Sequence, residues 1–595
     1  MSLNLLATHP SIVSFCLPLL LIAIAPAATS QSITPEADGT GTNITTDGNR
    51  IDIHGGQLSG DGANLFHSFE EFGVSEGQIA NFLSNPNIEN ILGRVVGKDA
   101  SYINGLLQVT GGDSNLFLIN PAGIVFGSSA SLNVGGDFTA TTATGIGLGE
   151  NWLDVFGENS WSSLMGNPDA FAFATANPGS IVNDGNLAVN SGQNLGLFGG
   201  VVTNSGTLSA PDGNITLMAV EGESLVRLSA SGNVLSLDVA SGEAGIGEED
   251  FTPLSLPQLL AGGEDLGHAS QIAVNGDGTV SLVGSDVKID PEAGTTIASG
   301  ELTANGDDST IQVLGNQVAV LDATLDVSGI EGGGNIFIGG DFQGSGTIPN
   351  ARVTLVDGNT NIFADAMESG DGGRVILWAD ETTAFLGNIS ARGGALSTSN
   401  ILSSSPPLSP SSSNGGFVEV SGKQNLIFEG LVDVSAANGS LGTLLLDPAN
   451  ITISSGASTA GVDAALPDIF ANDFDGQDIT INAATLENQT GNVILEATND
   501  ITLDTSLSFS PGGGAIEFTA DSDRNDVGAF LGAGRGIQAE YRDVTISGAS
   551  VEIGSIDTSS DMSSFKAGGD ITLTATNGDI TTGSLNSDSF YLSGG

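Results

Sequence analysis

The sequence predicts an all-β fold, a right-handed parallel β-helix from which a few loops or short strands project. Helical periodicity is scarce after residue 31, and short runs of Val, Ile, Leu, Phe and Thr alternate with polar residues and end at Gly, Asn or Asp. Glycine makes up 86 of 595 residues, roughly twice its ordinary share of ~7%. Because Gly, Asn and Asp let a chain turn within few residues, this composition is typical of short strands joined by tight corners.

The charge balance excludes two classes of partner. The chain has 69 Asp and Glu against 13 Lys and Arg, a formal net charge of −56. Such a charge repels nucleic acid and anionic lipid, so we expect no nucleic-acid partner and no membrane binding through a basic patch. Only 14% of the residues are charged and 39% are hydrophobic, so the sequence can bury a core and is expected to fold.

The N-terminus has the pattern of a secretory signal peptide. Residues 12–25 form an apolar run that is short and interrupted, and small residues suited to cleavage follow at 25–30. We therefore predict a signal peptide over residues 1–30, although residues 1–11 contain no Lys or Arg and the initiator methionine is open to reassignment. Cys16, the single cysteine, lies inside it, so the mature chain would contain no disulfide.

The strand starts carry a degenerate repeat. Strands are predicted at residues 115–119, 213–218, 351–356 and 373–378. An Asn or Asp followed by Ile-Thr recurs at Asn214, Asn450, Asp478, Asp500 and Asp570. The closest two of these starts are 22 residues apart. A period near twenty with several short strands is typical of stacked parallel coils. Three segments interrupt it: 147–176 and 241–270, predicted to leave the coil, and a flexible Ser/Pro-rich loop at 396–414.

A search for catalytic and metal-binding patterns predicts no enzyme and no cofactor. The only Gly-x-Ser-x-Gly sequence, at residues 73–77, has no downstream histidine except His268 and is interpreted as a turn. His54 and His67 are isolated from other metal ligands. A carbohydrate-active β-helix enzyme would need clustered cations beside its acids, whereas Arg524 stands alone near Asp521 and Asp523. We therefore name no catalytic, cofactor-binding or metal residue.

Residues 38–143 resemble the secretion domain, or haemagglutination-activity domain, of two-partner secretion exoproteins of the filamentous haemagglutinin family. Two motifs carry the resemblance in the expected order, Asn85-Pro86-Asn87-Ile88 and Asn120-Pro121-Ala122-Gly123-Ile124. They match the family's Asn-Pro-Asn-Leu and Asn-Pro-Asn-Gly-Ile motifs, with Ile88 in place of Leu and Ala122 in place of Asn. Residues 90–95, 103–105 and 131–136 also look like the family, and weaker likeness continues to about residue 290.

The resemblance implies a partner and a route of export. The partner would be an outer-membrane β-barrel transporter with periplasmic POTRA domains, which captures the secretion domain before it folds. From the residues alone, an Asn-Pro pair starts a turn and Gly123 supplies positive φ, so both motifs are expected to hold corners of the coil. Whether residues 85–88 and 120–124 also contact the transporter stays open.

The predicted organisation is a signal peptide at 1–30, a secretion domain at 31–290, a β-helical region at 291–445 and further degenerate repeats at 446–595. The predicted function is a secreted or surface-exposed exoprotein whose β-helical body acts as an adhesin or structural stalk. Two alternatives stay open, a carrier for a toxin or enzyme located beyond residue 595 and a carbohydrate-active enzyme. Residues 590–595 are strand-like without an evident cap, which indicates a fragment or a truncated gene product. The sequence names neither a host or cell-surface ligand nor an oligomeric state, and it leaves Ca²⁺ binding open.

Overall fold

The computed structural model describes residues 32–229, 232–239, 272–274, 280–282, 288–289, 292–395, 413–455, 480–511, 513–560 and 567–589, with backbone alone for residues 272–289. The predicted signal peptide, the segment 241–270 and residues 396–412 of the Ser/Pro-rich loop lie outside this set. Within it, no helix is long and apolar enough to cross a membrane.

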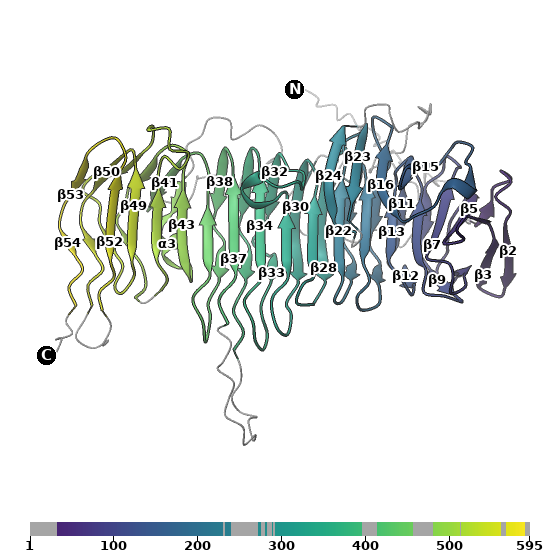
Figure 1. Ribbon diagram of the computed structural model, residues 1–595, viewed down its shortest axis with the longest axis horizontal. Coiled ribbons are helices and arrows are strands. Elements are labelled where there is room, and N and C mark those ends of the chain that lie inside the picture. Colours follow the sequence, from purple (N-terminus) through teal and green to yellow (C-terminus); the bar gives the residue numbers. More distant parts are fainter. Residues whose placement is uncertain are drawn as a thin grey trace, which may run out of the picture.

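The chain forms a parallel β-helix, as the sequence predicts. Each complete coil contributes three short strands, for example β10 (Asn115–Ile119), β11 (Ile124–Phe126) and β12 (Ser131–Asn133). Each strand pairs in parallel with the equivalent strand of the coil before and after it, so the coils stack into a long rod with three faces (Figure 1).

The first face is one continuous parallel ladder. Its strands in chain order are β5 (Asn64–Glu71), β7 (Asn90–Val95), β10, β13 (Phe138–Thr141), β19 (Leu195–Gly199), β22 (Asn214–Ala219), β29 (Thr310–Leu314), β31 (Asn335–Ile338), β34 (Arg374–Ala379), β37 (Phe417–Gly422), β40 (Thr443–Leu446), β43 (Asn492–Glu496), β46 (Ile516–Thr519), β49 (Val544–Gly548) and β52 (Ile571–Ala575). Most of these strands begin near an Asn or a Gly, which accounts for the sequence pattern of short runs separated by turn residues.

The second and third faces are joined by two long strands that bend around a corner, β28 (Thr295–Thr303) and β30 (Gln317–Asp326). The second face contains β8 (Ser101–Ile103), β11, β17 (Ile181–Asn183), β20 (Val201–Asn204), β32 (Val353–Val356), β35 (Thr382–Phe385) and β38 (Asn425–Phe428). The third face contains β3 (Arg50–Gly55), β6 (Ile79–Leu83), β9 (Leu106–Thr110), β12, β18 (Asn186–Ala188), β21 (Thr207–Ser209), β33 (Asn361–Phe363), β36 (Asn388–Ser390) and β39 (Leu431–Asp433).

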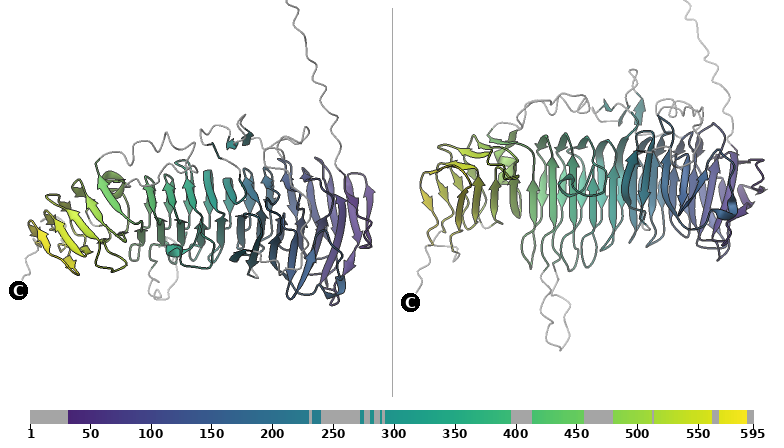
Figure 2. Two further views of the ribbon diagram at one scale, coloured as in Figure 1. Left: turned by 90° about the horizontal axis from the view of Figure 1, so that it is seen from above. Right: turned by 45° about the horizontal axis from the view of Figure 1, so that its top comes forward.

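Separate ladders take over the second and third faces near the C-terminal end. One contains β41 (Ile451–Ser454), β42 (Thr480–Asn482), β44 (Ile501–Leu503), β47 (Ala529–Gly532), β50 (Ser550–Ile553) and β53 (Ile580–Thr582). The other contains β45 (Leu507–Ser508), β48 (Ile537–Gln538), β51 (Ile556–Asp557) and β54 (Leu585–Asn586). At this place the rod bends, and its yellow-green end tilts away from the main axis (Figure 2).

The N-terminal end of the rod is closed by antiparallel strands. The hairpin β2 (Thr42–Asp47) and β3 covers the edge of the third face. Two short strands, β1 (Thr34–Pro35) and β4 (Gln57–Leu58), pair antiparallel with β5 on the first face. Antiparallel closure satisfies backbone groups that the first coil would otherwise expose at its edge.

A second sheet lies against the outer side of the first face near the N-terminal end. This covering sheet is antiparallel and consists of β15 (Asn151–Asp154), β14 (Gly145–Leu148), β16 (Pro168–Phe173), β23 (Ser224–Leu228) and β24 (Val234–Val239). The 3₁₀ turn η1 (Trp161–Ser163) belongs to the same region. The prediction that residues 147–176 leave the coil is therefore confirmed. Three further antiparallel strands are β25 (Ile272–Val274), β26 (Val280–Leu282) and β27 (Lys288–Ile289).

The coil step varies more than the sequence repeat suggests. Uninterrupted steps on the first face range from 20 residues, Leu195 to Ile215, to 28 residues, Ile516 to Val544. The 22-residue interval between Asp478 and Asp500 is not a coil step, because β42 and β44 pair with opposite sides of β41. The interpretation of that interval as one coil is wrong, since a strand is inserted there out of chain order.

The inserted segment contacts strands of two neighbouring coils, β41 and β39. After β41 the chain returns as β42 and the short helix α3 (Ala483–Glu487), and Asn482 caps the helix by accepting from the N–H of Ala484. Gln489 then accepts from the N–H of Val432 and donates to the carbonyl of Gly430, at the edge of β39. Among the described residues, no strand of the β40–β41 coil lies on the third face, and Gln489 lies at the edge of β39 there.

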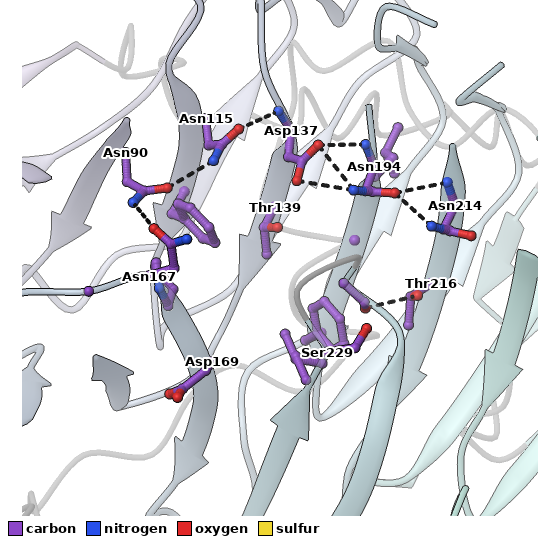
Figure 3. A pocket seen from close by; sticks show the side chains of 18 of the residues that line it. Asn90, Asn115, Asp137, Thr139, Asn167, Asp169, Asn194, Asn214, Thr216 and Ser229 are labelled. Atoms are coloured by element: carbon purple, nitrogen blue, oxygen red, sulfur yellow. Dashed lines mark hydrogen bonds between the residues drawn. The ribbon is translucent and has the colours of Figure 1, made fainter. Parts of the chain in front are cut away.

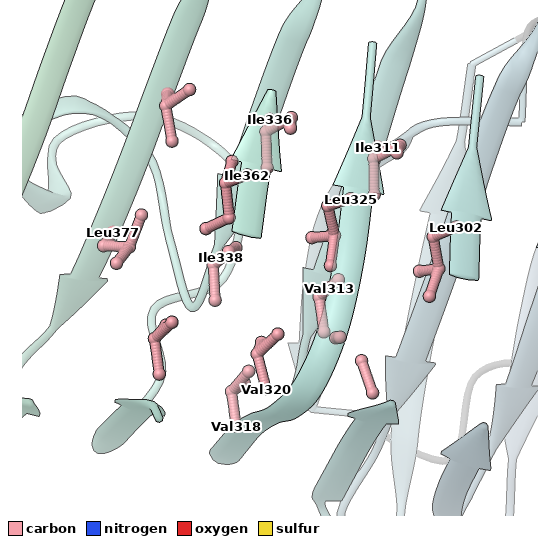
Figure 4. Close-up of a cluster of buried hydrophobic side chains, with 14 of the residues drawn as sticks. Leu302, Ile311, Val313, Val318, Val320, Leu325, Ile336, Ile338, Ile362 and Leu377 are labelled. Atoms are coloured by element: carbon pink, nitrogen blue, oxygen red, sulfur yellow. The ribbon is translucent and has the colours of Figure 1, made fainter. Parts of the chain in front are cut away.

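The core is a continuous stack of aliphatic and aromatic side chains inside the coils. Alternate residues of each strand point inward, so equivalent positions on successive strands stack, as do Ile311 and Ile336 or Val313 and Ile338 (Figure 4). Each fully buried side chain of this kind contributes roughly 1.5–3 kcal/mol. At the start of the first face, Asn90 donates to Asn64 at 2.8 Å and Asn115 donates to Asn90 at 2.9 Å, forming an amide ladder.

Candidate functional site

The first Asn-Pro motif forms an exposed corner between β6 and β7. The N–H of Ile88 donates to the carbonyl of Asn85 at 3.0 Å, which closes a β-turn with Pro86 and Asn87 at its tip. The side-chain oxygen of Asn85 also accepts from the N–H of Asn87 at 3.0 Å. Residues 85–87 are exposed, and Ile88 points into the core with 8% of its surface accessible. Only Ile88 is therefore committed to packing.

The second Asn-Pro motif forms the same kind of turn between β10 and β11, but it is buried. The N–H of Gly123 donates to the carbonyl of Asn120 at 3.1 Å, and the N–H of Ala122 donates to the Asn120 side chain at 2.9 Å. The Asn120 amide group also donates to the carbonyl of Asp99 and to the hydroxyl of Ser101. Gly123 has φ 126°, a conformation that disfavours any residue with a Cβ.

A returning segment buries this second corner. Residues 174–180 connect the covering sheet to β17, and the carbonyl of Ser180 accepts from the N–H of Ile124 at 3.0 Å. Gly179 lies so close to the carbonyl of Pro121 that a Cβ there would collide with it. Ala122 has only 2% of its surface accessible, so a larger side chain at that position would have to displace this segment.

Arg94 on β7 ties the N-terminal closure, the first face and the covering region together. Its guanidinium pairs with Asp38 at 2.8 Å and donates through Nη1 to the carbonyls of Asp154, Val155 and Gly157. The same group lies 5.0 Å from the ring centroid of Trp161. Arg94 is 4% exposed, so these contacts replace nearly all of its hydration.

The carboxyl group of Asp38 is held ionised by this arrangement. Burial acts to raise its pKa, but hydrogen bonds from Ser68, Thr40 and Arg94 outweigh burial and lower the pKa to about 2. The contribution of Asp38 to folding is therefore present above its ordinary pKa and is lost as pH falls through the lowered value. The family resemblance in the sequence includes residues 90–95, but no feature of the sequence distinguishes Arg94 among them.

The other candidate residues named from the sequence hold turns or pack in the core. In the Gly-x-Ser-x-Gly segment, the N–H of Gln78 donates to the carbonyl of Ser75, which confirms a turn. His67 is fully buried in the N-terminal core near Thr42, and burial, then the proximity of His54, lowers its pKa to about 4. Asp521 accepts from the backbone N–H groups of Asn525 and Asp526 and so holds a turn. His268 lies outside the described residues.

An acidic cluster lies on the first face near the middle of the rod. The turn η2 (Phe342–Gly344) covers Glu419, whose two oxygens accept from the N–H of Gln343 at 3.1 and 3.2 Å. Burial raises the pKa of Glu419 to about 7 and that of Asp447 to about 6. Gln343 also donates to Asp447 and Glu496, so the cluster fastens η2 to the rod. Among the described residues, no group of three or more acidic, His or Cys side chains is arranged to hold a metal ion.

A comparison with protein families agrees with the resemblance seen in the sequence. Residues 30–282 match the family described as the TPS secretion domain, where TPS stands for two-partner secretion. The crystal structure of the HMW1 secretion domain from Haemophilus influenzae is similar at 21% sequence identity and a TM-score of 0.36, covering 71% of this chain and 100% of that one. A comparison with curated proteins gives no match.

This family and fold are those of a secretion domain and not of a known enzyme family. A TPS secretion domain implies a cognate outer-membrane transporter as its partner. Residues 30–282 are the part of the chain that carries the match, and both Asn-Pro corners and Arg94 fall within them. Residues 30–282 of the chain therefore match the secretion domain of two-partner secretion exoproteins.

Proposed function

We propose that residues 31–290 direct export through a cognate outer-membrane transporter of the POTRA-barrel type, and that the remaining β-helix serves as an adhesin or structural stalk. Residues 1–30 would be the signal peptide for transport to the periplasm, and residues 291–445 and 446–595 the two parts of the stalk. The match of residues 30–282 to the TPS secretion domain is the observation that carries this proposal. The exported chain would be secreted or remain at the cell surface.

The exposed corner at residues 85–87 supports a direct contact with the transporter. Its three side chains face solvent, and the side-chain hydrogen bonds described there are local, from the Asn87 N–H to the Asn85 side chain and from the Ser84 hydroxyl to the Asn85 carbonyl. The corner at residues 120–124 is buried in the folded protein, so a transporter would contact it only before residues 174–180 cover it. The two motifs would then act at different stages of export.

Deletion of residues 31–145 tests the proposal as a whole. The full gene and the deletion are expressed with the cognate transporter, and the chain is measured in the culture medium, at the cell surface and in the periplasm. We expect the deletion to abolish appearance outside the cell and to leave the chain in the periplasm. Undiminished export of the deleted chain contradicts the proposal.

A paired substitution tests the contact at the exposed corner. We expect Asn85→Ala with Asn87→Ala to slow export several-fold while leaving thermal unfolding of the purified chain nearly unchanged. Asn525→Ala is the matched control, because Asn525 is also exposed and its side chain also accepts from the N–H two residues later. Equal export of the double variant and the control would show that residues 85–87 only hold a corner.

A further inference from the structure

A pocket of about 310 Å³ lies between the first face and the covering sheet. One wall is the amide ladder, which continues from Asn115 through Asp137 and Asn194 to Asn214 (Figure 3). The opposite wall comes from the start of β16, where Asn167 and Asp169 stand (Figure 3). Its volume falls at the lower end of the range for small-molecule sites.

The pocket exists because one row of outward side chains on the first face changes from large residues to small ones along the rod. Register on the first face aligns Phe66, Leu92, Phe117, Thr139, Gly196 and Thr216. The large members of this row, Phe66, Leu92 and Phe117, pack in the core beneath the covering sheet. Thr139 and Gly196 interrupt the row while the covering sheet continues past them. The Phe198 ring lies over Gly196, so the space that a larger side chain would fill is the one beside Thr139.

The polar groups around this space include both donors and acceptors. The Asp137 carboxylate accepts from the backbone and side chain of Asn194 at 2.7–3.2 Å, which fixes its orientation. Asn167 accepts from Asn90 at 3.0 Å, which places its amide at the rim. Thr139 adds a hydroxyl group and Asp169 a second carboxylate. Amides, a hydroxyl and carboxylates together match a ligand that both donates and accepts hydrogen bonds.

The remaining lining is apolar, and the two carboxylates around the pocket disfavour anionic ligands. Phe117 and Leu228 contribute apolar surface, and the described residues that line the pocket include no Lys, Arg or His. An anionic ligand would therefore meet two carboxylates, and Arg227, which lies near Asp169, is not among the lining residues. A guanidinium or ammonium group has only donors and would leave the amide donors of the wall unmatched. Hydroxyl groups on a ring with an apolar C–H face match both kinds of lining.

From this arrangement we infer that the pocket binds a neutral saccharide, with hydroxyl groups hydrogen-bonded to Asp137, Asp169 and Asn167 and one face of the sugar ring against Phe117 and Leu228. Burial raises the pKa of Asp169, opposed by Arg227, which is consistent with a carboxyl group that faces a partly water-excluded space. Hydrogen bonds to a ligand are stronger in such a space than in bulk water. The site would belong to the folded, exported protein and does not depend on the transporter.

Saturation-transfer NMR on the purified full chain tests the inference with glucose, galactose, mannose and N-acetylglucosamine as probes. We expect millimolar binding of at least one of them and none of glucuronate. Thr139→Phe should fill the space and remove binding, and Asp169→Asn should weaken it about tenfold by replacing one charged acceptor. Matched controls are Thr545→Phe, at an outward position of β49, and Asp47→Asn, on exposed β2.

The outcomes separate cleanly when thermal unfolding confirms that each variant is folded. Loss of binding in Thr139→Phe but not in Thr545→Phe supports a saccharide site in this pocket. Absence of binding by all four sugars overturns it, as does binding that Thr139→Phe leaves unchanged. Binding of N-acetylarginine amide without any sugar also overturns it and would assign the pocket to a basic side chain of a protein partner. Each of these results leaves the export proposal untouched.

Discussion

The two Asn-Pro corners have the same turn and opposite surroundings. Asn85 and Asn120 each accept one backbone N–H two residues later, at 3.0 and 2.9 Å, and each closes a β-turn through its carbonyl. Residues 85–87 are exposed, whereas residues 120–124 are buried beneath residues 174–180. The motif therefore specifies a corner of the coil, and the rest of the chain decides whether that corner is available to a partner.

The largest expected effect comes from removing the residue that holds the covering region. Arg94→Leu removes the charged partner of Asp38 and the Nη1 donor to the carbonyls of Asp154, Val155 and Gly157, and we expect it to cost about 3–5 kcal/mol of stability. Hydrogen exchange at residues 120–124 should then approach the rate at residues 85–88. Arg50→Leu is the control, since its pair with Asp52 is solvent-exposed and should contribute little to stability. Unchanged protection at residues 120–124 would show that Arg94 does not hold the cover.

The next effect concerns the buried corner itself. Asn120→Ala removes the acceptor for the Ala122 N–H and leaves the carbonyl of Asp99 without its donor inside the protein. We expect a loss of about 2–3 kcal/mol in urea unfolding monitored at this coil. Asn120→Asp keeps the acceptor but turns a carboxylate oxygen toward the carbonyl of Asp99 in place of the amide donor, so it should lose at least as much at neutral pH. A loss in Asn120→Asp well below that in Asn120→Ala would show that the donor to Asp99 contributes little.

Acidification should loosen the cover without any substitution. The lowered pKa of Asp38, about 2, means that its contribution is complete above about pH 4 and disappears as pH falls toward 2. We expect protection at residues 120–124 to fall over this range more than protection at residues 85–88, and by less than in Asn120→Ala. Asp38→Asn should remove the difference between pH 4 and pH 2. A fall of the same size in Asp38→Asn would assign the acid effect to other carboxylates.

The smallest expected effect is at the exposed corner. Asn85→Ala removes a hydrogen bond that water replaces, so we expect a loss of about 0.5–1 kcal/mol in the same urea assay. The exposed control Asn525→Ala should show a similar loss. A loss as large as that of Asn120→Ala would mean that exposure does not distinguish the two corners.

The sequence predicts the fold well because the coil is built from local rules. Alternation of apolar and polar residues ending at Asn or Gly identifies strands such as β10 and β22, and each pairs only with the coils directly before and after it. The strand order around β41 is not predictable in this way. The Ile-Thr starts at Asn450, Asp478 and Asp500 look equivalent, yet β42 is inserted by long-range packing against β41 and β38.

The candidate sites are predicted only in part, because their burial depends on residues far apart in the sequence. Asn85 and Asn120 are visible as motifs because a turn needs adjacent residues. Their different burial depends on residues 174–180, which lie more than fifty positions further along the chain, and no local pattern reports that contact. The pocket likewise depends on small residues, Thr139 and Gly196, which are noticed only when register places them in a row with Phe117.

The out-of-order insertion at β42 also sets a limit on directional folding. A rod whose coils stack in chain order can add each coil as it emerges, N-terminus first, without waiting for later sequence. Here the edge of β41 toward β38 stays unpaired until residues 480–482 have emerged, and the edge of β39 until Gln489 has. Strict addition of coils in chain order therefore breaks at β41, where pairing is completed by β42 and Gln489, which come later in the chain.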